Sequence, residues 1–67
     1  MPDIKYSLHA RKRMVERGIS AREVRDTILK GSKRTQGAKI VSVHKHLEVV
    51  FRNVGGDWYV ITVMLRW

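Results

Sequence analysis

A corner between two helices is the feature of this sequence that most constrains its fold. Gly18 can end a helix in the left-handed conformation that glycine adopts without strain. Ser20 and Glu23 have the spacing of a capping box, in which each residue's side chain accepts a hydrogen bond from the other's backbone. The sequence therefore predicts one helix over residues 7–17, with Ser7 as its N-cap, and a second over residues 20–30.

The hydrophobic period changes in the second half of the chain. From Val41 to Leu65 apolar residues alternate with their neighbours, and many are β-branched or aromatic, which is typical of antiparallel strands. Gly55 and Gly56 mark a hairpin turn between the last two strands. A weaker turn at Gly37 pairs residues 33–36 with the strand that follows it. Neither Lys45 nor its neighbour His46 favours a tight turn, so the path of the chain there is left open.

These elements predict one α+β domain that covers residues 1–67. Its two N-terminal helices pack on one face of a small, curved antiparallel sheet of three to four strands, placed within residues 39–66. In the second helix Ala21, Val24 and Ile28 form the predicted buried stripe. A chain this short has a small core, and without cysteine it has no disulfide or cysteine-bound zinc to stabilise it. We therefore expect a homodimer or a bound partner.

The positive charge of the chain is concentrated in its first part. The formal net charge is +8, and residues 1–39 hold eleven Lys and Arg against four Asp and Glu. Such an uneven basic charge is typical of proteins that bind nucleic acid, although a merely soluble surface also explains it. No apolar run is long enough for a signal peptide or a membrane span, so we expect a cytoplasmic protein without a membrane partner. No cofactor is predicted.

The first helix has two sides when its residues are projected at about 100° each. Apolar residues share one side: Leu8, Ala10, Met14 and Val15. Charged and titratable residues share the other: His9, Arg13, Glu16 and Arg17. His9, Arg13 and Arg17 follow one another at intervals of four residues, so they are neighbours on the helix surface. A polyanion would relieve the repulsion between the arginines, whereas neutralisation by Glu16 would leave only a solvated surface.

The segment from Ser7 to Ser20, continued by Val24 and Ile28, reads Ser-Leu-His-Ala-Arg and then Glu-Arg-Gly-Ile-Ser. It resembles the N-terminal signature of the domain-of-unknown-function 4258 family, a group of small prokaryotic domains. The segment from Tyr59 to Val63 resembles that family's closing Ile-Thr-Val strand. The resemblance covers nearly the whole chain and is looser between residues 33 and 46. Met64 departs from the family pattern, which often has tyrosine or tryptophan there, and the chain reaches Trp67 only at its end.

The family is similar in organisation to metal-independent RNases and toxins, among them barnase, colicin-type tRNases and RelE-like mRNA interferases. This similarity implies two helices before a curved antiparallel sheet, RNA as the partner and RNA cleavage as the activity. It also implies an antitoxin or immunity protein as a second partner. The residues that it assigns to the site are His9, Arg13, Arg17 and Thr62.

Metal-free RNA cleavage requires a base for the ribose 2′-hydroxyl, an acid for the leaving 5′-oxygen and cations for the phosphate. His9 could act as base or acid, because an imidazole exchanges protons at physiological pH. Arginine suits bidentate binding of phosphate. The predicted phosphate-binding residues are Arg13, Arg17, Arg11 and Lys12. The second proton carrier is left open among Glu16, His44 and His46.

Three alternatives compete with this interpretation. His44, His46 and Glu48 would share one face of an unbroken strand and could bind a divalent metal ion, although a chain reversal would separate them. The corner after Gly18 also suits a DNA-binding helix-turn-helix module. Against that module, polar residues occupy the seam between its helices and strands replace its third helix. The last alternative is a non-catalytic domain that binds a protein through its sheet edge.

Overall fold

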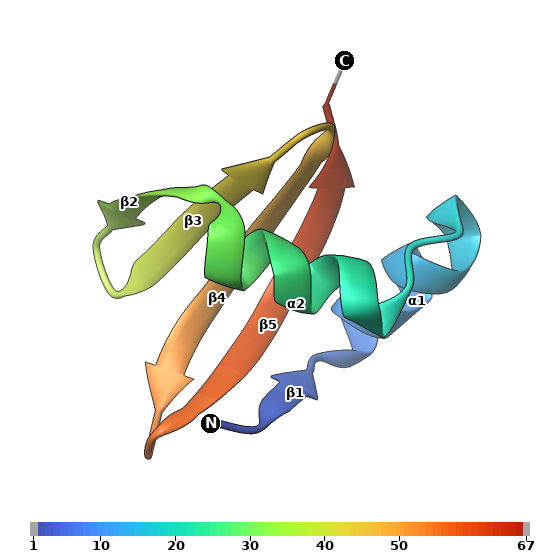
Figure 1. Cartoon of the computed structure of the whole chain (residues 1–67). Helices are drawn as coiled ribbons and strands as arrows, with labels where there is room; N and C mark the ends of the chain where they lie inside the picture. The colour runs from blue at the N-terminus through green and yellow to red at the C-terminus, as the bar shows by residue number, and fades with distance from the viewer. Residues whose placement is uncertain (1, 67) are drawn as a thin grey trace.

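A computed structural model describes residues 2–66 and shows an α+β fold with both helices beside one sheet (Figure 1). The elements follow in the order β1 (Ile4–Tyr6), α1 (Leu8–Arg17), α2 (Ala21–Lys30), β2 (Ser32–Gln36), β3 (Lys39–His44), β4 (Leu47–Val54) and β5 (Asp57–Leu65). The predicted fold class and the predicted helix–corner–helix order are confirmed. Trp67, the aromatic residue that the chain reaches only after the position of the family's tyrosine or tryptophan, lies outside the described residues.

Local hydrogen bonds define the ends of both helices, as the sequence predicts. The Ser7 side chain accepts from the Ala10 amide at 3.0 Å. Gly18 ends α1 with φ 65°. At α2 the Glu23 amide donates to Ser20 Oγ at 3.1 Å, and the Ser20 amide donates to Glu23 Oε1 at 2.9 Å. These backbone and side-chain hydrogen bonds with Ser20 lower the pKa of the Glu23 carboxyl group, because the charged carboxylate is the better acceptor.

The sheet has five strands rather than the predicted three to four, in the order β1-β5-β4-β3-β2. β1 pairs in parallel with β5, and every other pair of neighbouring strands is antiparallel. Ile4 and Tyr6 indicate a short extended segment before the first helix, and β1 is that segment. Its place in the sheet was not predicted, because three residues are too few to show a period and the partner strand lies at the other end of the sequence. All five residues of β2 are polar and exposed, so this strand shows no alternation of apolar residues. The predicted pairing across the Gly37 turn is confirmed.

The chain reverses between β3 and β4 in a two-residue turn. His44 and Leu47 are paired, and Lys45 lies between them with φ 56°. It is the one residue other than glycine with a positive φ in residues 2–66. A left-handed residue is what a tight hairpin turn requires, but lysine is an uncommon choice for it. The sequence alone therefore gave no reason to place a turn there.

The core lies between the two helices and the sheet. Ala10 from α1 and Val24 and Ile28 from α2 belong to one buried cluster with residues of β4 and β5, chiefly Val49 and Val63. The predicted stripe on α2 is partly wrong, because Ala21 is exposed. Thr27 is buried instead, and its hydroxyl donates to the Glu23 carbonyl at 2.8 Å, which satisfies the polar group within the helix.

The apolar side of α1 is divided in the structure. Ala10 is fully buried and Met14 packs against the core, but Leu8 and Val15 are 86% and 84% exposed. The rotation of the helix is set at its start, where the Ser7 amide and hydroxyl donate to the carbonyls of Val60 and Ile61 in β5. This anchor turns the side of α1 that carries Ala10 and Met14 toward β5, and it leaves Leu8 and Val15 in solvent.

The end of α2 packs tightly against β3. The Ser42 hydroxyl donates to the Thr27 carbonyl, and a methyl group at Gly31 would lie 2.5 Å from that carbonyl oxygen and 2.8 Å from the Val43 carbonyl oxygen.

We expect Gly31→Ala to lower the free energy of unfolding by about 3 kcal/mol, because the backbone atoms that the methyl group would meet cannot move away as a side chain can. Gly18→Ala, with open space around it, should cost about 1 kcal/mol from its left-handed backbone alone. Urea denaturation of both variants tests this order, and a smaller loss for Gly31→Ala would contradict the packing.

Candidate nucleic-acid interface

Three predicted site residues lie together on the surface of α1, and we call them the α1 stripe: His9, Arg13 and Arg17. His9 and Arg17 are exposed, and Arg13 is half-buried. In residues 2–66 none of the three forms a hydrogen bond or an ion pair. Glu16 is also exposed and forms no ion pair with either arginine, so the structure shows no direct contact for the alternative in which Glu16 neutralises the stripe. The stripe therefore presents uncompensated positive charge.

Arg11 and Lys12 do not belong to the stripe. Arg11 lines a groove on the other flank of α1, together with Met14 and Val15. At about 100° per residue, Arg11 is roughly half a turn of the helix away from His9 and Arg13. Lys12 is exposed on the outer surface of the helix. The four predicted phosphate-binding residues thus divide between different sides of α1.

Thr62 lies in β5, next to the strand residue that anchors α1. The Ser7 hydroxyl donates to the Ile61 carbonyl at 2.7 Å, which ties the first turn of α1, with His9 in it, to the residue before Thr62. Thr62 is half-buried and pairs with Val50 of β4. Thr62 therefore follows directly after the residue that anchors α1, and its pairing with Val50 puts its side chain on the sheet face opposite the helices.

The other candidate proton carriers are not beside His9. His44 and His46 line a cleft at the end of the sheet with residues of α2 and Leu65, and no residue of α1 contributes to it. Glu16 is on α1 but lies two turns from His9, about 10 Å along the helix axis. Of the described residues, none forms a hydrogen bond or ion pair with the His9 imidazole.

The metal alternative lacks the geometry that it needs. The turn at Lys45 ends β3 at His44, and β4 begins at Leu47, so the strand that would align the three ligands is interrupted. Glu48 is buried and accepts from Arg66 at 2.8 Å. Across residues 2–66 no group of three or more His, Asp and Glu side chains is arranged to hold a metal ion.

One surface that the sequence reasoning missed is the sheet face opposite the helices. Val41 and Val50 are paired and only 1% and 9% exposed, yet both lie outside the cluster under the helices. Alternation along the strands puts Arg34, Arg52 and Tyr59 on this same face, because Arg34 pairs with Val41 and Arg52 pairs with Tyr59. Val50 and Arg52 are two residues apart in one predicted strand, and this spacing could have indicated from the sequence that they share a sheet face.

The remaining alternatives can also be compared with the structure. After Gly31 the described chain, up to residue 66, forms strands and turns, so this part contains no third helix of a helix-turn-helix module. Neither helix in residues 2–66 has the length and hydropathy that crossing a membrane requires.

Together these features define a small basic α+β domain in which an anchored helix carries unpaired arginines at the edge of a five-stranded sheet. The model of one family, Domain of unknown function (DUF4258), matches residues 6–65, and the chain belongs to this family. This confirms the family resemblance of the helical segment. No curated protein and no solved structure matches the chain. The similarity to barnase, colicin-type and RelE-like proteins therefore remains a prediction.

Proposed function

We propose that this domain binds RNA through the phosphate backbone and that the α1 stripe is the main contact surface. The observation that carries the proposal is that Arg13 and Arg17 lie one helical turn apart and neither forms an ion pair in residues 2–66; Arg17 is exposed and Arg13 is half-buried. Two arginines at this spacing repel each other by a few tenths of a kcal/mol. Phosphates bound between them replace this repulsion with attraction and accept charge-assisted hydrogen bonds from each guanidinium.

In the proposal, the sheet face opposite the helices extends this surface. The stripe lies on the flank of α1 opposite the groove that α1 shares with the start of α2. An RNA strand that follows the stripe and crosses β5 near Thr62 would then meet Arg52 and Tyr59. Arginine at such a position binds phosphate, and an exposed aromatic ring stacks on an unpaired base. The expected ligand is single-stranded RNA.

A second proposal is that the domain cleaves the RNA without a metal ion. It rests on His9, an exposed imidazole with no partner in residues 2–66, one turn from Arg13. In this proposal His9 removes the proton of the ribose 2′-hydroxyl, whose oxygen attacks the neighbouring phosphorus atom. The bond to the 5′-oxygen breaks, that oxygen takes up a proton from solvent water, and a 2′,3′-cyclic phosphate is formed. Arg13 stabilises the extra negative charge on the phosphate oxygens.

The partner and location that the RNase resemblance implies are also proposals. A toxin of this kind acts on cytoplasmic RNA and is held inactive by an antitoxin or immunity protein. An acidic partner that covers the α1 stripe would block the RNA site directly. A homodimer, expected from the small core, is a further proposal for this chain.

Salt dependence of RNA affinity tests the binding proposal. We expect the dissociation constant for a single-stranded RNA oligomer, measured by fluorescence anisotropy between 50 and 200 mM salt, to rise steeply. Each neutralised phosphate contributes about 0.7 to the slope of log affinity against log salt, so contacts to three or more phosphates predict a slope of about −2 or steeper. Absence of binding at the lowest salt, or a slope near zero, would contradict the proposal.

A further inference from the structure

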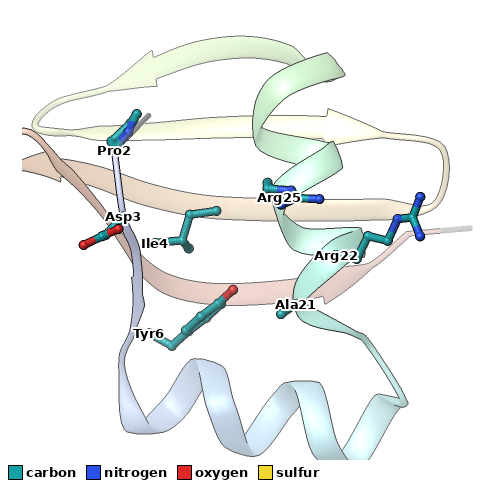
Figure 2. Close-up of a pocket in the computed structure, with 7 residues that line it drawn as sticks. All are labelled: Pro2, Asp3, Ile4, Tyr6, Ala21, Arg22 and Arg25. Atoms are coloured by element: carbon teal, nitrogen blue, oxygen red, sulfur yellow. The ribbon is translucent and has the colours of Figure 1, made fainter.

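A second basic site lies between the β1 segment and the first part of α2, which line a cleft of about 390 Å³ (Figure 2). The cleft is lined by Pro2, Asp3, Ile4, Tyr6, Ala21, Arg22 and Arg25. Figure 2 shows the Tyr6 ring rising from β1 between α1 and α2, with its hydroxyl group toward α2, and Arg22 and Arg25 on that helix. None of these residues belongs to the α1 stripe.

The charge in this cleft is positive and uncompensated. Arg22 and Arg25 are one helical turn apart, and neither forms a hydrogen bond or an ion pair with another residue of the range 2–66. Asp26 has the spacing of an ion pair with Arg22, but it forms none and lines a different cleft with Glu23 and Lys30. Asp3 is the acidic residue of the lining, and in Figure 2 its carboxylate points away from α2.

The Tyr6 hydroxyl is close to guanidinium groups from both helices. Burial raises the pKa of Tyr6, and the positive charges of Arg25 and Arg11 oppose that rise. Both arginines therefore lie near enough to act electrostatically on the phenol oxygen. An anion in the cleft would have the Tyr6 hydroxyl as a donor and the guanidinium groups of Arg22 and Arg25 in the lining around it.

Tyr6 also lines a neighbouring apolar groove, so the cleft and the groove share this side chain. The groove has a volume of about 530 Å³ and is bordered by Met14, Val15 and Ile19, with Arg11 at its side. Val15 is 84% exposed although it is fully apolar. The combined site thus offers cationic and hydroxyl groups at one end and an apolar floor at the other. A ligand that matches it has a phosphate attached to a flat, weakly polar ring.

We propose that this site binds a nucleotide, with its phosphate held by Arg22, Arg25 and the Tyr6 hydroxyl and its base in the groove of Met14, Val15 and Ile19. The site is separate from the RNA surface on the α1 stripe and does not depend on it. The nucleotide is either a free mononucleotide or the phosphorylated 5′ end of an RNA, since both present the same groups.

Titration with adenosine 5′-monophosphate, followed by amide chemical shifts of the full chain, tests the proposal. We expect shifts at Tyr6, Ala21, Arg22 and Arg25, and weaker binding of both inorganic phosphate and adenosine than of the whole nucleotide. Tyr6→Phe keeps the ring and should weaken binding about tenfold, because it removes one hydrogen bond to a charged group. Shifts confined to other regions, or no binding at millimolar nucleotide, would overturn the proposal.

Charge-matched variants separate this site from general attraction of anions. The double variant Arg22→Gln/Arg25→Gln should weaken nucleotide binding by about tenfold or more, whereas Lys30→Gln/Lys45→Gln removes the same charge from a different cleft, at the far end of α2, and should leave it nearly unchanged. Equal losses in the two variants would overturn the site. Arg13→Gln/Arg17→Gln should retain nucleotide binding even where RNA binding is lost, so the two proposals fail independently. Comparison of a 5′-phosphorylated with a 5′-hydroxyl RNA oligomer identifies the source: preference for the former supports an RNA end, and equal weak binding supports a free mononucleotide.

Discussion

Replacement of His9 by alanine is expected to lower the rate of RNA cleavage by about 10²- to 10⁴-fold, the usual contribution of one general acid–base group. The imidazole is exposed and has no partner in residues 2–66, so its loss should not disturb the packing of α1. RNA affinity should change by less than about twofold, because in this proposal the arginines of the α1 stripe supply the attraction of phosphates. Rates are measured on a labelled RNA oligomer, and affinity is measured on the same oligomer.

The chemistry of the products and a matched control make this test specific. Cleavage should persist in the presence of a chelator and leave 2′,3′-cyclic phosphate ends, because the 2′-hydroxyl is the nucleophile. His46→Ala serves as control, since that histidine lies in the cleft at the end of the sheet and not beside α1. An unchanged rate in His9→Ala would remove His9 from the chemistry. Binding without cleavage of varied RNAs would leave an RNA-binding domain without nuclease activity.

The second large effect is expected from the double variant Arg13→Gln/Arg17→Gln. Loss of two phosphate contacts should flatten the slope of log affinity against log salt by about 1.4 for single-stranded RNA. At low salt the affinity itself should fall by about tenfold or more, since each contact is a charge-assisted hydrogen bond. The measurement is fluorescence anisotropy across a salt series, with circular dichroism to verify that half-buried Arg13 is dispensable for folding.

A control variant with the same loss of charge is Lys30→Gln/Lys45→Gln. Both lysines line the cleft at the far end of α2, which contains no residue of α1. We expect this variant to keep most of the affinity and nearly the whole salt slope. If the two double variants lose the same amount, the basic charge acts as a general solvated surface, and the α1 stripe is not the RNA site.

The sequence predicted well those parts of the fold that depend on near neighbours. Ser7, Gly18 and the Ser20–Glu23 capping box define the ends of both helices through hydrogen bonds within a few residues. The alternation after residue 39 identified three antiparallel strands for the same reason, since the period of two is local. The grouping of His9, Arg13 and Arg17 likewise follows from helical spacing alone.

The sequence did not predict contacts between distant segments. β1 joins β5 in parallel through pairs such as Ile4 with Trp58, and three residues contain no signal for a partner so far along the chain. The hydrogen bonds of Ser7 to Val60 and Ile61 set the rotation of α1 and therefore left Val15 in solvent. The separation of His44 and His46 from His9 is a consequence of the sheet topology, which spacing in the sequence cannot reveal.

Sequence alone thus determined the helices, their caps, the strand-rich second half and the arginines four residues apart, because each depends on hydrogen bonds or periodicity within a few residues. The tertiary structure decided which of these groups meet. The two flanks of α1 acquire different surroundings only when β1 pairs with β5 and α2 packs across the sheet. One flank of α1 then carries Arg13 and Arg17, and Tyr6 lies with Arg22 and Arg25 in the cleft between the β1 segment and α2. Burial of Ala10, Val24 and Ile28 against the sheet fixes the orientation of both helices.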